Sequence, residues 1–321
     1  MLKKLTFKKI GISTLLLLLA LILYNYPEEI NAPINDVKCE YISIYLIDKN
    51  DFVAMTKIMI NDDEDDQISY ILNSLIIDSN KDIPKGFKAT IPSGTKILGY
   101  QLDGELLKIN FSKEFLNGEI KSYEVMIESI IYSLTSIKGV KKIMLFVEGE
   151  KLNKIPNSNI NLGLYLDRTF GINKVVDVTD FHDVSMTTVY YVRNDIDKYY
   201  VPISYISNDN SDKVEIIIES LKTNRLNSSK LSSHLDYQVE LMNYETSNEN
   251  IILDFNEVLL DSLENGKLKE EVKYAISYSI YDTLGVENVI FLVNSNKIDE
   301  FRLEMWLNLL YNQFVPWVMS S

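Results

Sequence analysis

The sequence predicts an α+β fold that occurs twice in tandem, behind an apolar N-terminal segment. Three observations predict it: residues that recur 146 positions later, hydrophobic periodicity that changes between strand and helix spacing, and a long apolar run near the start. The matching pairs include Tyr132 and Tyr278, Ser133 and Ser279, Gly139 and Gly285, and Val140 and Val286.

This repeat divides the chain into five sections. We expect two tandem domains at 38–153 and 186–297, separated by an ordered connection at 154–185. The N-terminal lysines and a membrane anchor occupy 1–27, and an amphipathic C-terminal helix or tail occupies 298–321.

The first copy begins with two strands and a helix. Apolar and polar residues alternate through 41–47 and 52–60, and turn-forming residues at 48–51 join the two strands. The acidic run 62–66 then opens a helix, because acids are favourable at a helix N-terminus. The run lacks the internal Gly and the terminal Glu of an EF-hand loop, so we expect a helix start and no calcium site.

The second half of the copy is a hairpin, a long helix and a final strand. The hairpin spans 96–111 and turns at Asp103-Gly104, a favoured two-residue turn. The helix covers 123–137, and a strand follows at 142–148. The resulting order is β-β-α-β-β-α-β, which predicts an open sheet with two helices on one face.

The first thirty residues predict a membrane anchor. Four lysines precede an apolar run from Ile10 to Tyr24, which fits either a cleaved signal peptide or a retained transmembrane helix. Large or acidic residues follow the run where signal peptidase requires small ones, which favours retention. Cys39 lies too far beyond the run for a lipoprotein signal. The lysines indicate a cytoplasmic N-terminus, with everything after Pro27 outside the cytoplasm.

The charge balance excludes several classes of partner. The chain has 32 basic and 46 acidic residues, a net charge of −14. Without the four N-terminal lysines, 28 bases remain against 46 acids, so the rest of the chain carries −18. Such a body repels phosphate, which argues against nucleic acid and anionic lipid surfaces. A single cysteine excludes an internal disulfide framework and a cysteine-based zinc site.

No residue pattern predicts catalysis. The two histidines, His182 and His234, stand in polar surroundings without a nucleophile motif or a metal-ligand spacing. Glycines are few, and the sequence contains no phosphate-binding loop. We therefore predict no catalytic residues, no metal site and no cofactor, and we expect that the protein is not an enzyme.

Several separated phrases resemble the GerMN domain family. The likeness rests on Ile91-Pro92-Ser93-Gly94-Thr95, on Ile109-Asn110-Phe111-Ser112, and on Phe146-Val147-Glu148-Gly149. Between the copies, Leu166-Asp167-Arg168 and Gly171-Ile172-Asn173 resemble the phrase that links tandem GerMN domains. The resemblance covers 41–297, although the second copy lacks the Ile-Pro-x-Gly-Thr phrase.

The resemblance implies an extracytoplasmic protein of sporulation or germination, without catalytic activity. GerMN domains are similar to ring-building modules, small α/β units that associate side by side. Family members are commonly lipoproteins, so here a transmembrane helix would supply the tether. The domains are then expected outside the cell membrane, in the intermembrane space of the forespore if the organism forms spores.

Two features predict where partners bind. On the second helix of the second copy, Tyr274, Tyr278 and Tyr281 fall opposite the apolar face, and they form a candidate interaction surface. Either another subunit or the chain's own tail covers them, and we favour the tail. Its candidate docking residues are Leu303, Trp306, Leu307, Leu310 and Phe314. The connection at 157–185 is too apolar for a free linker, and Val175-Val176 is a candidate for pairing at a sheet edge.

Together these features predict a membrane-anchored assembly protein that is part of a cell-envelope or intercellular channel complex. Its strong net negative charge opposes self-assembly, so the expected partners are other envelope or sporulation-complex proteins in a hetero-oligomer. The alternative is an envelope hydrolase acting on peptidoglycan, or its accessory or ligand-binding module.

Overall fold

The structure is a computed structural model that describes residues 39–61, 66–79, 83–118, 122–156, 158–180, 182–194, 198–223, 231–232 and 234–303. The chain divides into two compact units, Met1–Lys38 and Cys39–Ser321. The predicted transmembrane helix belongs to the first unit and lies outside the described residues. Within the described ranges, no helix is long and apolar enough to cross a bilayer.

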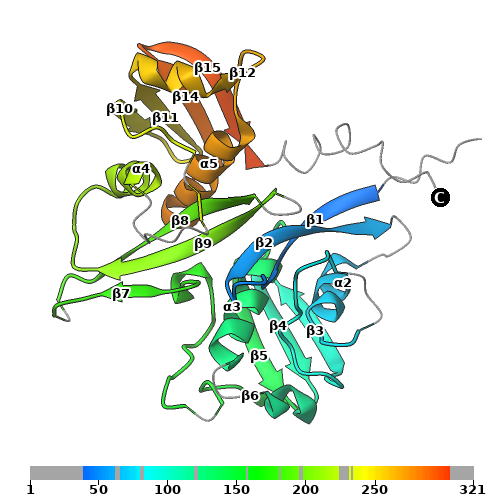
Figure 1. The fold of residues 1–321 in the computed structure, drawn as a ribbon. Helices are drawn as coiled ribbons and strands as arrows, with labels where there is room; N and C mark the ends of the chain where they lie inside the picture. Colours follow the sequence, from blue (N-terminus) through cyan, green and yellow to red (C-terminus); the bar gives the residue numbers. More distant parts are fainter. Residues whose placement is uncertain are drawn as a thin grey trace, which may run out of the picture. The chain divides into compact units, whose positions relative to one another are not determined.

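The first copy has the predicted order of strands and helices and one additional short strand (Figure 1). Its elements are β1 (Cys39–Ile47), β2 (Val53–Asn61), α2 (Gln67–Ser74), β3 (Ile97–Asp103), β4 (Leu106–Phe111), the 3-10 helix η1 (Lys113–Asn117), α3 (Ser122–Leu134), β5 (Lys142–Val147) and β6 (Glu150–Lys151).

The connection contains the 3-10 helix η2 (Arg168–Phe170) and β7 (Val175–Asp177), and the second copy follows. Its elements are β8 (Ser185–Asn194), β9 (Lys198–Ser207), α4 (Lys213–Thr223), β10 (Leu241–Thr246), β11 (Asn250–Phe255), the 3-10 helix η3 (Glu257–Ser262), β12 (Leu263–Glu264), β13 (Lys267–Leu268), α5 (Glu270–Leu284), β14 (Asn288–Val293) and β15 (Asn296–Arg302). β15 extends past 297, so residues 298–302 belong to the sheet and not to the tail. Phe301 explains this, since it is buried opposite Val289 of β14.

The expectation of one open sheet per domain is wrong. β3, β4, β5 and β6 form one four-stranded sheet, and β10, β11, β14 and β15 form its equivalent in the second copy. The first hairpin of each copy leaves its own domain and joins a shared five-stranded sheet, in the order β1-β2-β9-β7 with β8 also paired to β9. Sequence periodicity predicts strands but not their partners, because both hairpins are apolar enough for burial on either sheet.

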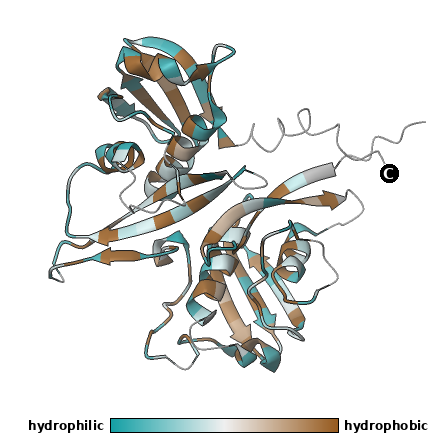
Figure 2. Cartoon of the chain, in the orientation of Figure 1, coloured by the Kyte–Doolittle hydropathy of each residue, from teal (hydrophilic) through white to brown (hydrophobic). Residues whose placement is uncertain are grey.

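The helices α3 and α5 lie between sheets. In Figure 1, α3 lies between the β1–β2 hairpin and its four-stranded sheet, and α5 has the same position in the second copy. Met126 to Thr135 are all buried, which explains why this stretch is apolar around most of its circumference. Figure 2 shows the hydrophobic residues concentrated on the strands and on these two helices. Each copy therefore has three layers: hairpin, helix and sheet.

Equivalent contacts in the two copies support the duplication. The Tyr45 N–H of β1 donates to Ser133 Oγ of α3 at 2.9 Å, and the Tyr190 N–H of β8 donates to Ser279 Oγ of α5 at 2.9 Å. The ring centroids of Tyr45 and Tyr132 lie 5.4 Å apart, as do those of Tyr190 and Tyr278. Hydroxyl groups of the helices thus accept hydrogen bonds from backbone N–H groups on the outer edge of each hairpin, and this protects that edge from pairing with another strand.

Local signals account for several element ends. Asp66 caps α2, because its carboxylate accepts the N–H groups of Ile68 and Ser69 at 2.9 and 3.3 Å. The β3–β4 hairpin turns at Gly104 and Glu105, one position later than predicted, since Asp103 still pairs with Leu106. Gly104 has φ +60° at the first turn position, where a type II′ turn requires glycine.

Candidate functional site: the interdomain clamp

The connecting segment from Leu166 to Lys174 contacts both copies, and we call it the interdomain clamp. Its first residue extends the sheet of the first domain, since Leu166 and Ile143 of β5 exchange two backbone hydrogen bonds of 2.8 Å. Asp167 then caps η2 by accepting the Thr169 N–H at 2.9 Å. These two contacts hold the next residue, Arg168, in place between the copies.

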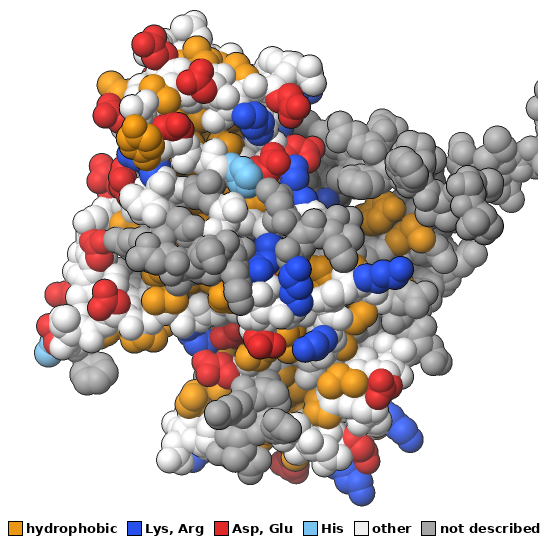
Figure 3. All heavy atoms as spheres, viewed as in Figure 1, with side chains coloured by type: hydrophobic (Ala, Val, Ile, Leu, Met, Phe, Trp, Pro, Cys, Tyr) orange, Lys and Arg blue, Asp and Glu red, His pale blue; other side chains and the backbone are white. Residues whose placement is uncertain are grey.

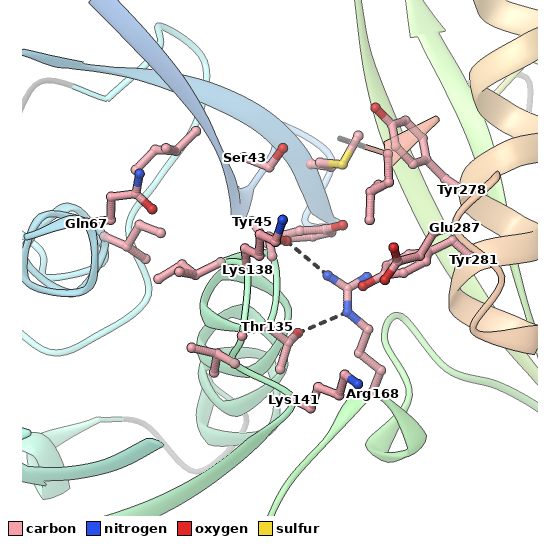
Figure 4. A pocket seen from close by; sticks show the side chains of 18 of the residues that line it. Ser43, Tyr45, Gln67, Thr135, Lys138, Lys141, Arg168, Tyr278, Tyr281 and Glu287 are labelled. Carbon is pink, nitrogen blue, oxygen red and sulfur yellow. Dashed lines mark hydrogen bonds between the residues drawn. The ribbon is translucent and has the colours of Figure 1, made fainter. Parts of the chain in front are cut away.

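Arg168 uses its whole guanidinium group for contacts within the chain. On the side of the first copy, Nε donates to Thr135 Oγ1 at 2.9 Å, and Nη2 donates to Ser136 Oγ at 2.9 Å and to the Tyr132 carbonyl at 3.2 Å. On the side of the second copy, Nη1 donates to the Asp282 carboxylate and to the Tyr190 hydroxyl. Figure 4 shows the bond to Thr135 at the edge of a pocket. An arginine with all donors satisfied is a structural tie and is a poor receptor for an external anion.

The ion pair of Arg168 with Asp282 is buried. The side chain of Arg168 is 15% exposed and that of Asp282 is 1% exposed. Burial alone would lower the pKa of Arg168, but Asp282 and the neighbouring tyrosines raise it well above its usual value. Burial raises the pKa of Asp282, and Arg168 opposes that shift. Each charge of the pair is therefore compensated mainly by its partner, which makes the pair sensitive to removal of either one.

Tyrosines from both copies surround this ion pair. The Arg168 guanidinium carbon lies 4.7 Å from the ring centroid of Tyr132, 5.7 Å from that of Tyr45 and 5.6 Å from that of Tyr281. Across the domain boundary, the hydroxyls of Tyr45 and Tyr190 are hydrogen-bonded at 2.9 Å. Tyr190 also donates to Asp282. Burial raises the pKa of the Tyr190 hydroxyl well above its usual value, so this network stays protonated.

Asn173 joins the two hairpins where their strands separate. Strands β2 and β9 pair at a single position, Met55 with Tyr200. Beyond it, the Asn173 amide accepts the Val53 N–H at 2.9 Å and donates to the carbonyls of Val53 and Pro202 at 2.7 and 2.8 Å. Its side chain thus makes the hydrogen bonds that a neighbouring strand would make, at a point where Pro202 has no N–H to donate.

Neighbouring residues hold Asn173 in this position. Gly171 has φ +78°, and an added Cβ would lie 3.1 Å from Met186 Sδ, so only glycine fits without strain. Ile172 is fully buried and exchanges hydrogen bonds of 2.9 Å with Ser204 of β9. Lys174 Nζ lies 2.6 Å from Glu128 of α3. Burial raises the pKa of Glu128, and the charge of Lys174 opposes that shift.

The shared sheet has a second polar contact between the copies, at the turn after β1. One oxygen of the buried Asp48 accepts the N–H groups of Asn50 and Phe52 at 2.8 and 3.0 Å. The other accepts the Tyr199 hydroxyl of β9 at 2.9 Å and lies 3.6 Å from Arg193. The copies are therefore joined by several polar contacts near the turn ends of both hairpins.

A pocket of about 310 Å³ opens beside the clamp (Figure 4). Its lining residues come from β1, β2, α2, the α3–β5 turn, the clamp, β8 and α5, with Glu287 before β14 and Leu303 after β15. Apolar or aromatic side chains, including Ile71, Ile137, Val140, Tyr278 and Tyr281, form most of its wall. Lys138, Lys141 and Glu287 supply its charges together with Arg168.

The predicted tyrosine surface lies mostly inside the chain. Tyr278 is 4% exposed and packs against Tyr190 and Tyr200 of the shared sheet, while Tyr274 and Tyr281 are partly buried. The helical wheel placed these residues opposite one apolar face, but α5 has a layer on each side, so both faces are covered. Whether a subunit or the tail covers the remaining surface stays a prediction.

Of the predicted tail residues, the structure describes only one. Leu303 is partly buried against the core and lines the pocket. Trp306, Leu307, Leu310 and Phe314 lie outside the described residues.

The two histidines of the described part of the chain lie apart from any metal grouping. The His182 side chain is 92% exposed, with Nδ1 3.6 Å from Asp180. Burial lowers the pKa of His234 in its loop. Across the described residues, no three His, Cys, Asp or Glu side chains lie close enough to hold a metal ion.

Sequence reasoning noticed the clamp but missed its role. The sequence identifies Leu166-Asp167-Arg168 and Gly171-Ile172-Asn173 only as a linking phrase. The signal available was an arginine in a connection rich in apolar residues, together with a Gly and an Asn that tolerate positive φ. Val175 and Val176 pair with Tyr205 and Ile206 of β9, which is the edge pairing that the sequence suggested.

Comparison with known proteins agrees with this architecture. The Germane family, described as "Sporulation and spore germination", matches residues 43–153. The spore germination protein GerM of Bacillus subtilis (strain 168) is 26% identical over 261 residues, 78% of this chain and 70% of GerM. The solved tandem GerMN domains of that sporulation protein match with a TM-score of 0.71 at 24% identity, over 80% of this chain and 92% of theirs. Residues 43–153 therefore match the Germane family, the fold is that of tandem GerMN domains, and the chain as a whole resembles GerM.

Proposed function

We propose that this protein acts in sporulation or germination as a non-enzymatic assembly protein of the cell envelope. The resemblance to GerM supports the biological process, since the names of that relative refer to sporulation and spore germination. The interdomain clamp supports the assembly role and is the observation that carries it.

The clamp gives the domain pair a fixed geometry. A partner that contacts both domains of a rigid pair does not have to immobilise them on binding, so less conformational entropy is lost. A rigid pair therefore suits a scaffold that holds other proteins at a set spacing. Enzymes that close on a substrate require the opposite, a hinge between domains.

The connection also presents apolar side chains to solvent. Leu164 is 70% exposed and Val176 is 66% exposed. Ile160, Tyr165 and Val184 are exposed to a smaller extent. Exposed apolar residues that gather in one segment are typical of protein contact sites. We therefore place the first partner contact on the connection and on the outer edge of β7.

The tether and the charge complete the proposal. The predicted N-terminal helix would hold the domains at the cell membrane, on its outer side. The net charge of −18 beyond the N-terminal lysines opposes association of identical copies and favours different partners in a hetero-oligomer. This charge is uneven, since Figure 3 shows Lys and Arg gathered across the middle of one face. Partners can therefore contact a basic region on a mainly acidic body.

A second candidate is a ligand-binding accessory module of the envelope. The pocket of about 310 Å³ favours it, because small-molecule sites begin at roughly 300 Å³ and are mostly apolar. Peptidoglycan fragments bound to the purified protein would support this alternative.

Crosslinking in cells tests the assembly role. The membrane-anchored protein is crosslinked during sporulation, purified and examined by mass spectrometry, alongside a Leu164→Asp variant and a Glu150→Lys control on an exposed strand. We expect envelope proteins to copurify with the wild type and the control, and several-fold less with Leu164→Asp. Recovery of the protein alone, or only of further copies, would reject a hetero-oligomeric scaffold.

A further inference from the structure

The chain leaves its last described strand at the rim of the interdomain pocket. The Leu303 N–H donates to the Glu287 carbonyl at 3.1 Å, and the side chains of both residues line the pocket. Leu303 therefore belongs to the same pocket wall as Tyr278 and Tyr281.

The chemistry of the following segment matches the pocket wall. Residues 304–321 contain no Lys, Arg or His, and most are apolar or aromatic. Trp306, Leu307, Leu310 and Phe314 continue the spacing that begins at Leu303, so one side of the segment needs burial. The pocket offers an apolar wall of suitable character, with Ile71, Ile137 and Val140 among its residues.

Charge favours the same match. Glu304 is the only charged side chain of the segment, and it directly follows the residue at the rim. Lys138, Lys141 and Arg168 outnumber the single acid Glu287 in the pocket wall. Arg168 pairs with Asp282 and Lys141 lies 2.8 Å from Glu105, and an acid is tolerated beside a wall in which bases outnumber acids.

We infer that the segment from Glu304 onward folds back into this pocket, with Trp306 as the side chain that fills it. The segment then contacts β1, the α3–β5 turn and α5 together, so it seals the boundary between the two GerMN domains. A segment covalently joined at the rim outcompetes a free ligand of similar intrinsic affinity, because its effective concentration is in the millimolar range. The pocket is therefore an intrachain docking site.

Photo-crosslinking in the full chain tests this inference. Trp306 is replaced by p-benzoylphenylalanine in the membrane-anchored protein, and crosslinked peptides are mapped by mass spectrometry. Mixing isotope-labelled and unlabelled chains separates bonds within a chain from bonds between chains. The matched control carries the same probe at Leu164, which is 70% exposed. A second variant, Ser43→Trp, narrows the pocket from β1.

We expect the Trp306 probe to crosslink within the chain to peptides containing Ser43, Val140 or Tyr281, and the Leu164 probe to give none of these products. Ser43→Trp should lower the yield at least threefold while the melting temperature stays within a few degrees of the wild type. Crosslinks from Trp306 to a second copy, to another protein or to lipid would overturn the inference. A Trp306 probe that reacts with none of the pocket peptides would also overturn it.

Discussion

Removing one partner of the buried ion pair should destabilise the protein more than any surface change. The Asp282 side chain is 1% exposed, and Arg168→Met leaves this buried carboxylate without its counter-ion. The substitution also removes five hydrogen bonds. Breaking a buried pair in this way costs about 3–5 kcal/mol. That loss is a large share of a domain's stability, which is about 5–15 kcal/mol. We expect a similar loss for Asp282→Leu, since it leaves Arg168 charged among tyrosine rings.

The double variant distinguishes a coupled pair from two independent contacts. Arg168→Met with Asp282→Leu removes both charges, and apolar replacement of a buried pair is often close to neutral. The Tyr45–Tyr190 hydroxyl bond remains, so we expect a loss of about 1–2 kcal/mol, much less than the sum of the single losses.

Urea unfolding of a soluble fragment that begins after Pro33 measures all three variants. The control is the exposed pair Lys108 and Asp103, whose side chains are 36% and 68% exposed. The coupling energy of this control pair, obtained from the two single variants and the double variant, should stay below about 1 kcal/mol. Single losses below about 1 kcal/mol at Arg168, or a double loss equal to the sum, would refute the role of the clamp.

Three further variants test other parts of the account. Asn173→Gly keeps the positive φ but removes three hydrogen bonds at the hairpin junction. Calorimetry should show that the free energy of unfolding falls by about 2 kcal/mol or more. An unchanged melting temperature would contradict the proposed role of this amide in joining the two hairpins. Gly171→Ala should cost about 1–2 kcal/mol in urea unfolding, because φ is +78° and Met186 lies close, and a neutral result would exclude strain there. Burial lowers the pKa of Lys57 from 10.5 to about 8, and Glu270 opposes this shift. The stability of the folded protein is therefore unaffected by Lys57 ionisation above pH 10.5, and it falls as the pH decreases from 10.5 to 8, because the buried amine must then carry a charge. The free energy of unfolding of Lys57→Met should therefore exceed that of the wild type by up to about 3 kcal/mol at pH 7, and the two should be equal above pH 10.5. Urea unfolding at several pH values measures this, and an equal difference at every pH would exclude titration of Lys57 as the cause.

Local order was predictable from the sequence, because it depends on nearby residues. The strands of the first hairpin follow an alternation that lies entirely within 41–60, and Asp66 caps its helix through bonds to residues two and three positions later. The repeat located the second copy because Tyr132 and Tyr278 have equivalent packing roles.

The pairing of the two hairpins was not predictable in the same way. Met55 and Tyr200 are 145 residues apart, and no local pattern specifies which sheet a hairpin joins. The burial of Tyr278 was not predictable for a related reason. A helical wheel ranks positions on one helix, but it contains no information on the layer that covers Tyr278 from the other side.

The interdomain clamp escaped prediction because its chemistry depends on distant groups. Arg168 finds its counter-ion 114 residues later, at Asp282. In the sequence it stands in a connection rich in apolar residues, next to Asp167. A buried arginine needs a partner, but the sequence does not identify that partner.

The central claim is that the clamp makes the two copies one rigid body. Residual dipolar couplings of backbone N–H groups in the soluble fragment test it most directly, with separate alignment tensors fitted to 39–151 and 185–302. We predict a single shared tensor in the wild type and a reduced tensor for one domain in Arg168→Met. Two different tensors in the wild type would contradict the claim, because they would show that the domains reorient independently despite the clamp.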